Sequence, residues 1–220
     1  MHITLQNLLH IQNEIKEKIK EFNIYKFNPK IIAVSKTFKI DHIMHLVDHG
    51  HIHYGENKVQ EAIEKWTEIR KNNQNLKLHM IGKLQSNKVK QAVKIFDYIH
   101  SVDSIKLAKK IKTEQEEVGK NLGIFLQVNL GDEVQKNGVN KSNLNELVNF
   151  CKEINLNVLG LMCLPPFEDN SSKYFEELKK LNDLFSFTEI SMGMSHDYLE
   201  AIKFRTTFLR IGSKIFGKRN

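Results

Sequence analysis

The hydrophobic residues at the start of the chain recur at intervals of three or four, which places them on one face of an amphipathic helix: Leu8, Ile11, Ile15, Ile19 and Phe22. Residues 30–34 follow Pro29 as a short, continuous apolar run, which is typical of a strand buried on both faces. Asp41 is then placed to cap a helix that Gly50 would end in the left-handed conformation. The sequence therefore predicts an initial helix followed by a strand–helix unit.

The alternation of apolar runs with helical patterns continues along the chain. Further strands are predicted at residues 52–54, 76–81, 98–102, 124–130, 158–164, 189–192 and 207–211, and helices near residues 56–69 and from Ser86 onward. Strands that alternate with helices imply right-handed crossovers and a parallel sheet. About eight strands in 220 residues predict an α/β fold, a (β/α)8 TIM-type barrel forming a single domain over residues 1–220. The initial helix would take the outer position after the last strand, and a doubly wound open sheet is the alternative.

Composition narrows the class of protein. The 40% hydrophobic content allows a sizeable core, while no apolar run approaches the roughly 20 residues of a membrane-spanning helix. The first residues lack a basic-then-apolar leader, so we expect a cytoplasmic protein that does not bind membranes. Cys151 and Cys163 are the only cysteines and do not form a CxxC pair, so we expect buried, unreactive thiols rather than disulfides.

The formal net charge of +7 raises the possibility of nucleic-acid binding, because clustered cations bind phosphate backbones. The lysines are instead spread over the whole chain, often beside glutamate or at helical spacing, as in Lys106, Lys109, Lys110 and Lys112. Such spacing is typical of solvated helix faces. Nucleic acid is therefore a disfavoured partner.

Lys36 is the first candidate functional residue, because it follows the first predicted strand directly. The active sites of barrels form at the carboxyl ends of the strands, so an apolar run there would lead this lysine toward the site. A desolvated lysine has a pKa lowered from about 10.4 toward neutrality, which makes its amine a nucleophile suited to a Schiff base. Most other lysines are expected on the surface.

Small and hydroxyl-bearing residues follow the last two predicted strands. Residues 191–195 (SMGMS) and the pair Gly212 and Ser213 lie where barrels usually bind phosphate. Glycine lets backbone N–H groups approach an anion, and a helix that begins near Ser195 or Ser213 would point its positive end at it. Alone, residues 191–195 fit a tight turn equally well; together with Lys36 they favour a phosphate site.

Histidines at residues 42, 45 and 49 share a helical face, and those at residues 49, 51 and 53 alternate into the second predicted strand. Both spacings suit metal ligands. These positions nevertheless fall on an outer helix or at the amino-terminal side of a strand, away from the catalytic face, and no carboxylate cluster accompanies them. We therefore predict no metal site.

Several segments together resemble the pyridoxal phosphate homeostasis proteins over nearly the whole chain. They are residues 33–37 (AVSKT), 54–61 (YGENKVQE), 79–88 (HMIGKLQSNK), 127–129 (QVN), 160–162 (GLM), 191–195 (SMGMS) and 210–217 (RIGSKIFG). Several of these blocks are long and irregular, so their agreement in this order is specific.

The resemblance implies a fold type III barrel, as in the alanine racemase N-terminal domain, that holds pyridoxal 5'-phosphate (PLP) as a Schiff base on the lysine matching Lys36. The other residues that it places at the cofactor are Ser195, Gly212 and Ser213 at the phosphate, Arg210 near the pyridine nitrogen, and Asn57 and His79 at the mouth of the site. The sequence departs from the family pattern at Ser213, where threonine is commoner, and at Arg205, where a small residue usually precedes the last strand.

The function implied by the resemblance is PLP homeostasis without robust catalytic turnover, so no catalytic residue is assigned. A permanent cation at Arg210 would disfavour protonation of the pyridine nitrogen and weaken the cofactor as an electron sink. The alternative is a fold type III amino-acid racemase or decarboxylase, whose site is completed by a second domain that we do not expect in this chain. The expected partners are PLP and PLP-dependent apoenzymes, and we expect a monomer.

Overall fold

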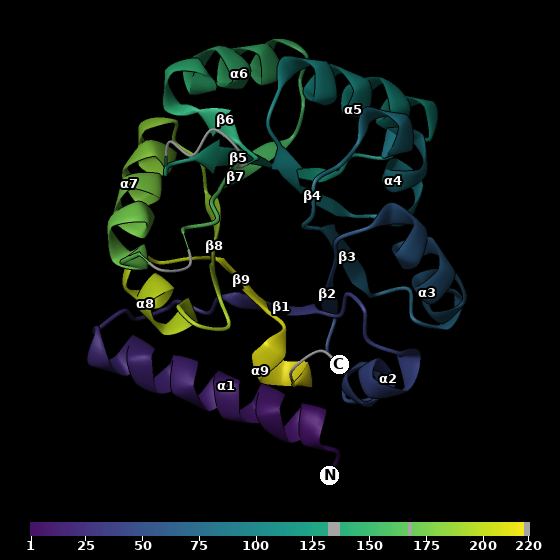
Figure 1. Cartoon of the computed structure of the whole chain (residues 1–220), viewed down its shortest axis with the longest axis vertical. Coiled ribbons are helices and arrows are strands. Elements are labelled where there is room, and N and C mark those ends of the chain that lie inside the picture. Colours follow the sequence, from purple (N-terminus) through teal and green to yellow (C-terminus); the bar gives the residue numbers. More distant parts are fainter. Residues whose placement is uncertain (132–136, 167–168, 218–220) are drawn as a thin grey trace.

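Parallel strands form a closed ring at the centre of the molecule (Figure 1). In this computed structural model, which describes residues 1–131, 137–166 and 169–217, the ring consists of β1 (Lys30–Val34), β2 (His53–Glu56), β3 (Lys77–Met80), β4 (Tyr98–Val102), β5 (Gly123–Asn129), β7 (Val158–Met162), β8 (Glu189–Met194) and β9 (Phe208–Ile211). Each strand pairs in parallel with the next, and β9 pairs with β1. The predicted barrel is confirmed, and closure excludes the open sheet.

Helices surround the ring on its outer side (Figure 1). Among the described residues they are α1 (Ile3–Glu21), α2 (Ile40–Asp48), α3 (Val59–Asn72), the 3-10 turn η1 (Ser86–Lys88), α4 (Val89–Ile95), α5 (Ile105–Glu117), α6 (Lys141–Glu153), α7 (Ser171–Leu184), α8 (Tyr198–Lys203) and α9 (Ser213–Phe216). Helix α1 packs against α2, α8 and α9, in the outer position predicted for it. None of the helices in the described part of the chain is both long enough and apolar enough to span a membrane.

One local prediction needs correction, one short strand was not predicted, and one prediction is confirmed. Helix α2 begins at Ile40 with Lys39 as its N-cap, so Asp41 lies in the first turn and does not cap the helix. The carboxylate there still faces the positive end of the helix dipole. A two-residue strand, β6 (Val139–Asn140), pairs with β5 and was missed, because two residues carry no periodic pattern. Gly50 has the predicted positive φ, +89°.

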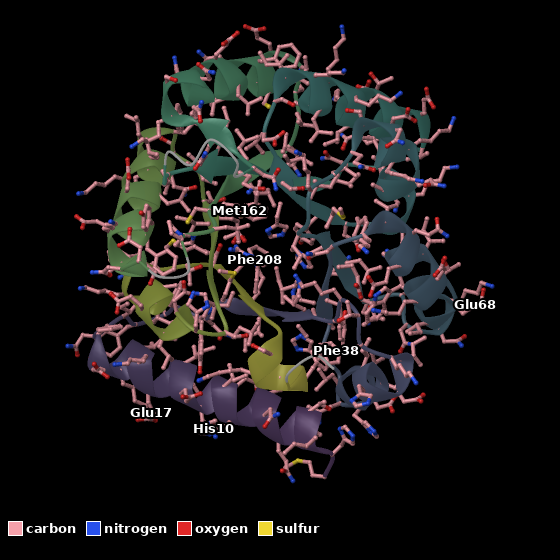
Figure 2. All side chains as sticks on the ribbon, viewed as in Figure 1. His10, Glu17, Phe38, Glu68, Met162 and Phe208 are labelled. Atoms are coloured by element: carbon pink, nitrogen blue, oxygen red, sulfur yellow. The ribbon has the colours of Figure 1, made fainter. Side chains whose placement is uncertain are left out.

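The strands separate two buried regions. Ile31 and Ala33 of β1 face the helices and join the larger hydrophobic core, whereas Ile32 and Val34 point into the barrel. The barrel interior also contains Phe125, Met162 and Phe208, and Figure 2 shows Met162 and Phe208 inside the ring, with His10, Glu17 and Glu68 on the outer helices. Polar side chains share the interior with these apolar ones, and the buried set includes His79, His100, Ser191 and Arg210.

Candidate functional site

A cavity of about 490 Å³ opens at the carboxyl ends of β1, β8 and β9. Its lining brings together six of the seven residues that the sequence placed at a cofactor: Lys36, Asn57, Ser195, Arg210, Gly212 and Ser213. The cavity is also lined by Val34, Ile81, Leu164, Met194 and His196, which sequence reasoning did not assign. Apolar lining residues carry no local chemical signal, and His196 was passed over because its neighbours fitted a phosphate loop.

Backbone contacts on both sides of Lys36 determine its position. Lys36 lies two residues beyond β1 and is partly buried. On one side, the carbonyl oxygen of Ser35 accepts a hydrogen bond from Lys65 Nζ at 2.8 Å. On the other, the N–H of Thr37 donates to Glu61 Oε1 at 2.5 Å, and Thr37 has a φ of +68°. The left-handed conformation at a β-branched residue is strained, so these contacts hold a turn that the chain would not otherwise favour.

The same region contains a buried carboxylate that the sequence did not single out. Glu56 is fully buried, and its Oε1 accepts hydrogen bonds from Ser35 Oγ at 2.7 Å, Lys65 Nζ at 2.9 Å and Trp66 Nε1 at 3.0 Å. The side chain of Lys65 is 9% exposed, so both members of this ion pair are largely removed from water. A buried charge is tolerated when it is paired and hydrogen-bonded. The pair therefore links β2 and α3 to the segment that carries Lys36.

Backbone N–H groups converge beyond the ends of β8 and β9, in the part of the cavity next to Val34. The N–H groups of Gly212 and Lys214 donate to Ser195 Oγ at 3.2 Å and 3.4 Å. A Cβ atom at residue 212 would lie 3.3 Å from both the Cβ and the carbonyl oxygen of Val34, so glycine keeps this corner open. Residues 191–194 belong to β8 rather than to a tight turn, and Ser195 follows directly. Two backbone donors beside the Ser195 and Ser213 hydroxyls suit a phosphate group.

Arg210 lies at the base of the cavity and is almost completely buried. Its Nη1 donates to Ser191 Oγ at 2.6 Å, and its Nη2 donates to the carbonyl oxygen of Cys163 at 2.8 Å. Burial lowers the pKa of the guanidinium, which still remains a cation at neutral pH. Cys163 and Cys151 are both free and buried as predicted, and burial raises each thiol pKa to about 12.

His79 does not line the mouth of the cavity, contrary to expectation. Its side chain is fully buried inside the barrel, where it hydrogen-bonds to His53 and His100. The prediction was wrong because residues alternate in direction along β3: Leu78 and Met80 pack against the helices, so His79 points inward at mid-strand. Within the described residues, no group of three or more His, Cys, Asp or Glu side chains could hold a metal ion.

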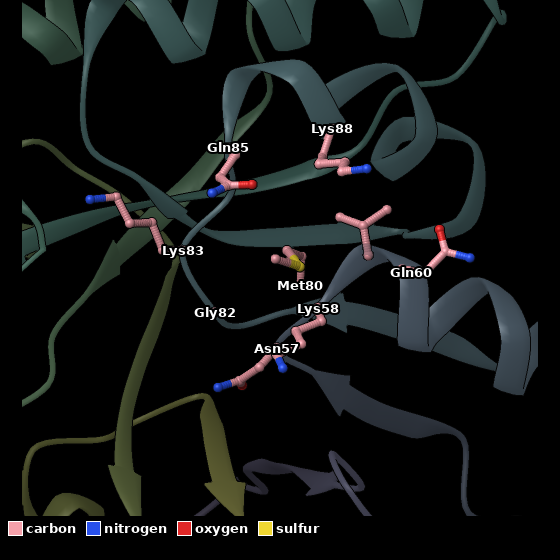
Figure 3. A pocket seen from close by; sticks show the side chains of 9 residues that line it. Asn57, Lys58, Gln60, Met80, Gly82, Lys83, Gln85 and Lys88 are labelled. Carbon is pink, nitrogen blue, oxygen red and sulfur yellow. The ribbon is translucent and has the colours of Figure 1, made fainter.

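A second cavity, of about 480 Å³, adjoins the first at the ends of β2 and β3 (Figure 3). Asn57 lines both cavities. A Cβ atom at residue 82 would lie 2.4 Å from the carbonyl oxygen of Asn57, so Gly82 lets the two loops approach closely. The lining of the second cavity carries three lysines, Lys58, Lys83 and Lys88. Its described lining residues include no arginine and no N–H groups that converge as in the first cavity. The first cavity is therefore the better fit to a phosphorylated aldehyde.

Comparison with known proteins shows the family and the fold of the chain. The family model of the alanine racemase N-terminal domain matches residues 3–220. The pyridoxal phosphate homeostasis protein of Pasteurella multocida is 33% identical, with 98% of this chain and 97% of the relative covered, and that of Aquifex aeolicus is 36% identical over 86% and 87%. Among solved structures, PipY of Synechococcus elongatus PCC7942 with PLP bound superposes with a TM-score of 0.76 at 32% identity, covering 92% of this chain and all of that one.

The buried ion pair next to Lys36 generates a stability prediction. Lys65→Met should lower the free energy of unfolding by about 3 kcal/mol, because it leaves the buried Glu56 carboxylate without its cation. The matched control is Lys71→Met on the same helix, whose pair with Glu68 is exposed on both sides and should contribute less than about 1 kcal/mol. Urea denaturation measures both, and equal losses would contradict the importance of the buried pair.

Proposed function

This chain belongs to the alanine racemase N-terminal domain family and, within it, to the pyridoxal phosphate homeostasis proteins, and from that premise we propose that it binds PLP in the cavity formed by β1, β8 and β9. The observation that carries the proposal is the meeting of three groups in one cavity: an amine at Lys36, the converging N–H groups beside Ser195, and the buried cation Arg210. An aldehyde, a phosphate and a pyridine nitrogen are the matching parts of PLP. Two similar proteins support the same ligand: one is named a pyridoxal phosphate homeostasis protein, and the other, PipY, has a solved structure with PLP bound.

The covalent step is a Schiff base between Lys36 and the cofactor. The Nζ amine adds to the aldehyde carbon, and the carbonyl oxygen leaves as water. Among the described residues of this lining, Lys36 is the one lysine. Ser195, Gly212 and Ser213 would hold the phosphate, and Asn57 would line the opening. Binding and release of the cofactor at this site would serve PLP homeostasis, including supply to PLP-dependent apoenzymes.

Arg210 favours a carrier over a catalyst. A guanidinium cannot accept a proton from a pyridinium, and its positive charge opposes protonation of the ring nitrogen. Bound PLP is a strong electron sink only when its ring nitrogen is protonated, so beside Arg210 it would be a weak electron sink. The rival function, amino-acid racemisation or decarboxylation, has one observation in its favour: His196 lines the cavity as a second possible base and lies 3.3 Å from the Asp197 carboxylate.

Replacement of Lys36 tests the Schiff base. Lys36→Ala should abolish the Schiff-base absorption band of the loaded protein and the fixation of the cofactor by borohydride, while the phosphate contacts still retain some non-covalent PLP. Lys83→Ala, in the adjoining cavity, is the matched control and should keep both signals. Circular dichroism checks that each variant is folded. A borohydride-fixed cofactor that persists in Lys36→Ala would refute the assignment.

Replacement of Gly212 tests the phosphate position. In Gly212→Val the branched side chain would press against Val34 and displace the backbone N–H groups. Losing one hydrogen bond to a charged group costs about 1.5 to 3 kcal/mol, so PLP should bind roughly 10- to 150-fold more weakly. Gly212→Ala should have a smaller effect, because one methyl group makes only a tight contact. Equilibrium titration with PLP measures the affinity of both variants. Unchanged affinity in Gly212→Val would show that the phosphate does not bind beside Gly212.

A turnover assay with amino acids distinguishes a PLP carrier from a racemase or decarboxylase. We expect no racemisation, decarboxylation or transamination of common amino acids at enzymatic rates, for which about 10 per second is typical. The assay incubates the loaded protein with a panel of L- and D-amino acids and follows chirality, carbon dioxide and keto-acid release. Saturable turnover near that rate, lost in both Lys36→Ala and His196→Ala, would identify an enzyme with two bases.

A further inference from the structure

An unbroken chain of hydrogen bonds crosses the interior of the barrel beneath the cavity. His53 Nδ1 lies 2.9 Å from His79 Nε2, and His79 Nδ1 lies 2.9 Å from His100 Nε2. His100 Nδ1 in turn lies 2.9 Å from Ser191 Oγ, the atom that accepts from Arg210. The three imidazoles, here called the imidazole column, thus join the amino-terminal end of β2 to the arginine at the base of the cavity.

Aromatic rings hold the column in place. The ring of His79 stacks on Tyr98 with centroids 4.4 Å apart, and that of His100 stacks on Phe125 at 4.3 Å. Phe208 contacts both imidazoles, with centroids 5.5 Å and 5.8 Å away. Rings confined in this way keep their orientation, so the identity of each hydrogen-bonding nitrogen is determined by packing.

Burial also keeps the column uncharged. His79 and His100 are fully buried, and desolvation holds the pKa of each well below the ordinary range. Desolvation lowers the pKa of the partly exposed His53 to about 4. At neutral pH each ring therefore carries one N–H donor and one lone-pair acceptor.

One arrangement of protons satisfies every member of the chain. Arg210 can only donate, so Ser191 Oγ accepts from it. Within the described residues, the other partner of the Ser191 hydroxyl is His100 Nδ1, so the hydroxyl proton goes there. His100 then carries its proton on Nε2 and donates to His79, which in the same way donates to His53. The reverse order would leave the Ser191 proton without an acceptor in the interior, at a cost.

We propose that the imidazole column is the counterpart of the buried Arg210 charge and acts, through Ser191, to hold its guanidinium toward the cavity. Every lone pair in the column points toward the arginine, so the dipoles align to stabilise its positive charge, and bonds in such a chain strengthen one another. None of the close ion pairs between described residues includes Arg210, and the buried Asp197 carboxylate acts on its charge only from a longer distance. The groups that contact the guanidinium directly are neutral acceptors. Ser191 and the imidazoles are positioning residues; their effect on PLP rests on the proposed function, whereas the order of protons does not.

The order of protons can be measured without the cofactor. In the full-length protein labelled with ¹⁵N-histidine, NMR distinguishes rings protonated on Nδ1 from those protonated on Nε2. We expect His79 and His100 to be neutral and protonated on Nε2 between pH 6 and 8. Either ring protonated on Nδ1, or charged in that range, would overturn the proposal.

Ser191→Ala tests the link to Arg210. It should disturb the His100 tautomer and weaken PLP binding about tenfold, as expected for loss of one hydrogen bond to a charged group. Ser101→Ala is the matched control, because Ser101 is also buried and its hydroxyl has no hydrogen-bond partner in the part of the chain that the structure describes. Equal effects of the two variants on tautomer and affinity would refute the proposal while leaving PLP binding intact. Absence of PLP binding in the unaltered protein would instead refute the proposed function, and the NMR result would stand.

Discussion

The pairing of β1 with β9 is the contact on which the candidate site depends. It joins a strand from the first fifth of the chain to its last strand, with Ile32 opposite Arg210 and Ala33 opposite Ile211. The register brings Lys36 and Gly212, each just beyond the end of its strand, to one cavity. Because side chains alternate across a strand, a shift of one residue would turn Arg210 toward the helices. Closure of the barrel and assembly of the site therefore depend on the same strand pairing.

The inside of the barrel differs in chemistry from the layer between strands and helices. The outer layer is a large, mainly aliphatic core, whereas the interior combines Phe125 and Phe208 with imidazoles, a hydroxyl and a guanidinium. Flat rings suit this arrangement, since they stack on one another while their edges exchange hydrogen bonds. The cavity consequently has a polar base that is almost completely buried, where electrostatic interactions are stronger than at a surface.

Much of this organisation could be predicted from local sequence, and the exceptions have a common cause. The strands were recognisable as apolar runs, and Lys36 stood out because it follows one of them. His79 was misplaced, and Glu56 and His100 were overlooked, because each role depends on which side of a strand faces the barrel and on which strand lies beside it. Such information is non-local: the two residues joined by the hydrogen bond between Ser191 and His100 are 91 positions apart in the sequence. A histidine within an apolar run gives no sign of such a role until the register of the paired strands is known.

The buried Glu56 carboxylate and the buried Arg210 guanidinium carry opposite charges, and they are stabilised by different means. The Glu56 carboxylate, on the helix side of β2, has a direct cation in Lys65, while the Arg210 guanidinium, inside the barrel, is hydrogen-bonded to a hydroxyl and a carbonyl. An oppositely charged side chain beside Arg210 would neutralise the field that it directs into the cavity, whereas neutral acceptors hold the group and leave that field in place. Beside Lys36, by contrast, the charges of Glu56 and Lys65 can neutralise each other, because they serve only to hold the backbone. The ion pair accordingly lies outside the barrel, and the neutral imidazole column lies inside it. Lys36 and Arg210 are thus both held in place before a ligand enters. This lowers the free-energy cost of ordering the site when the ligand binds.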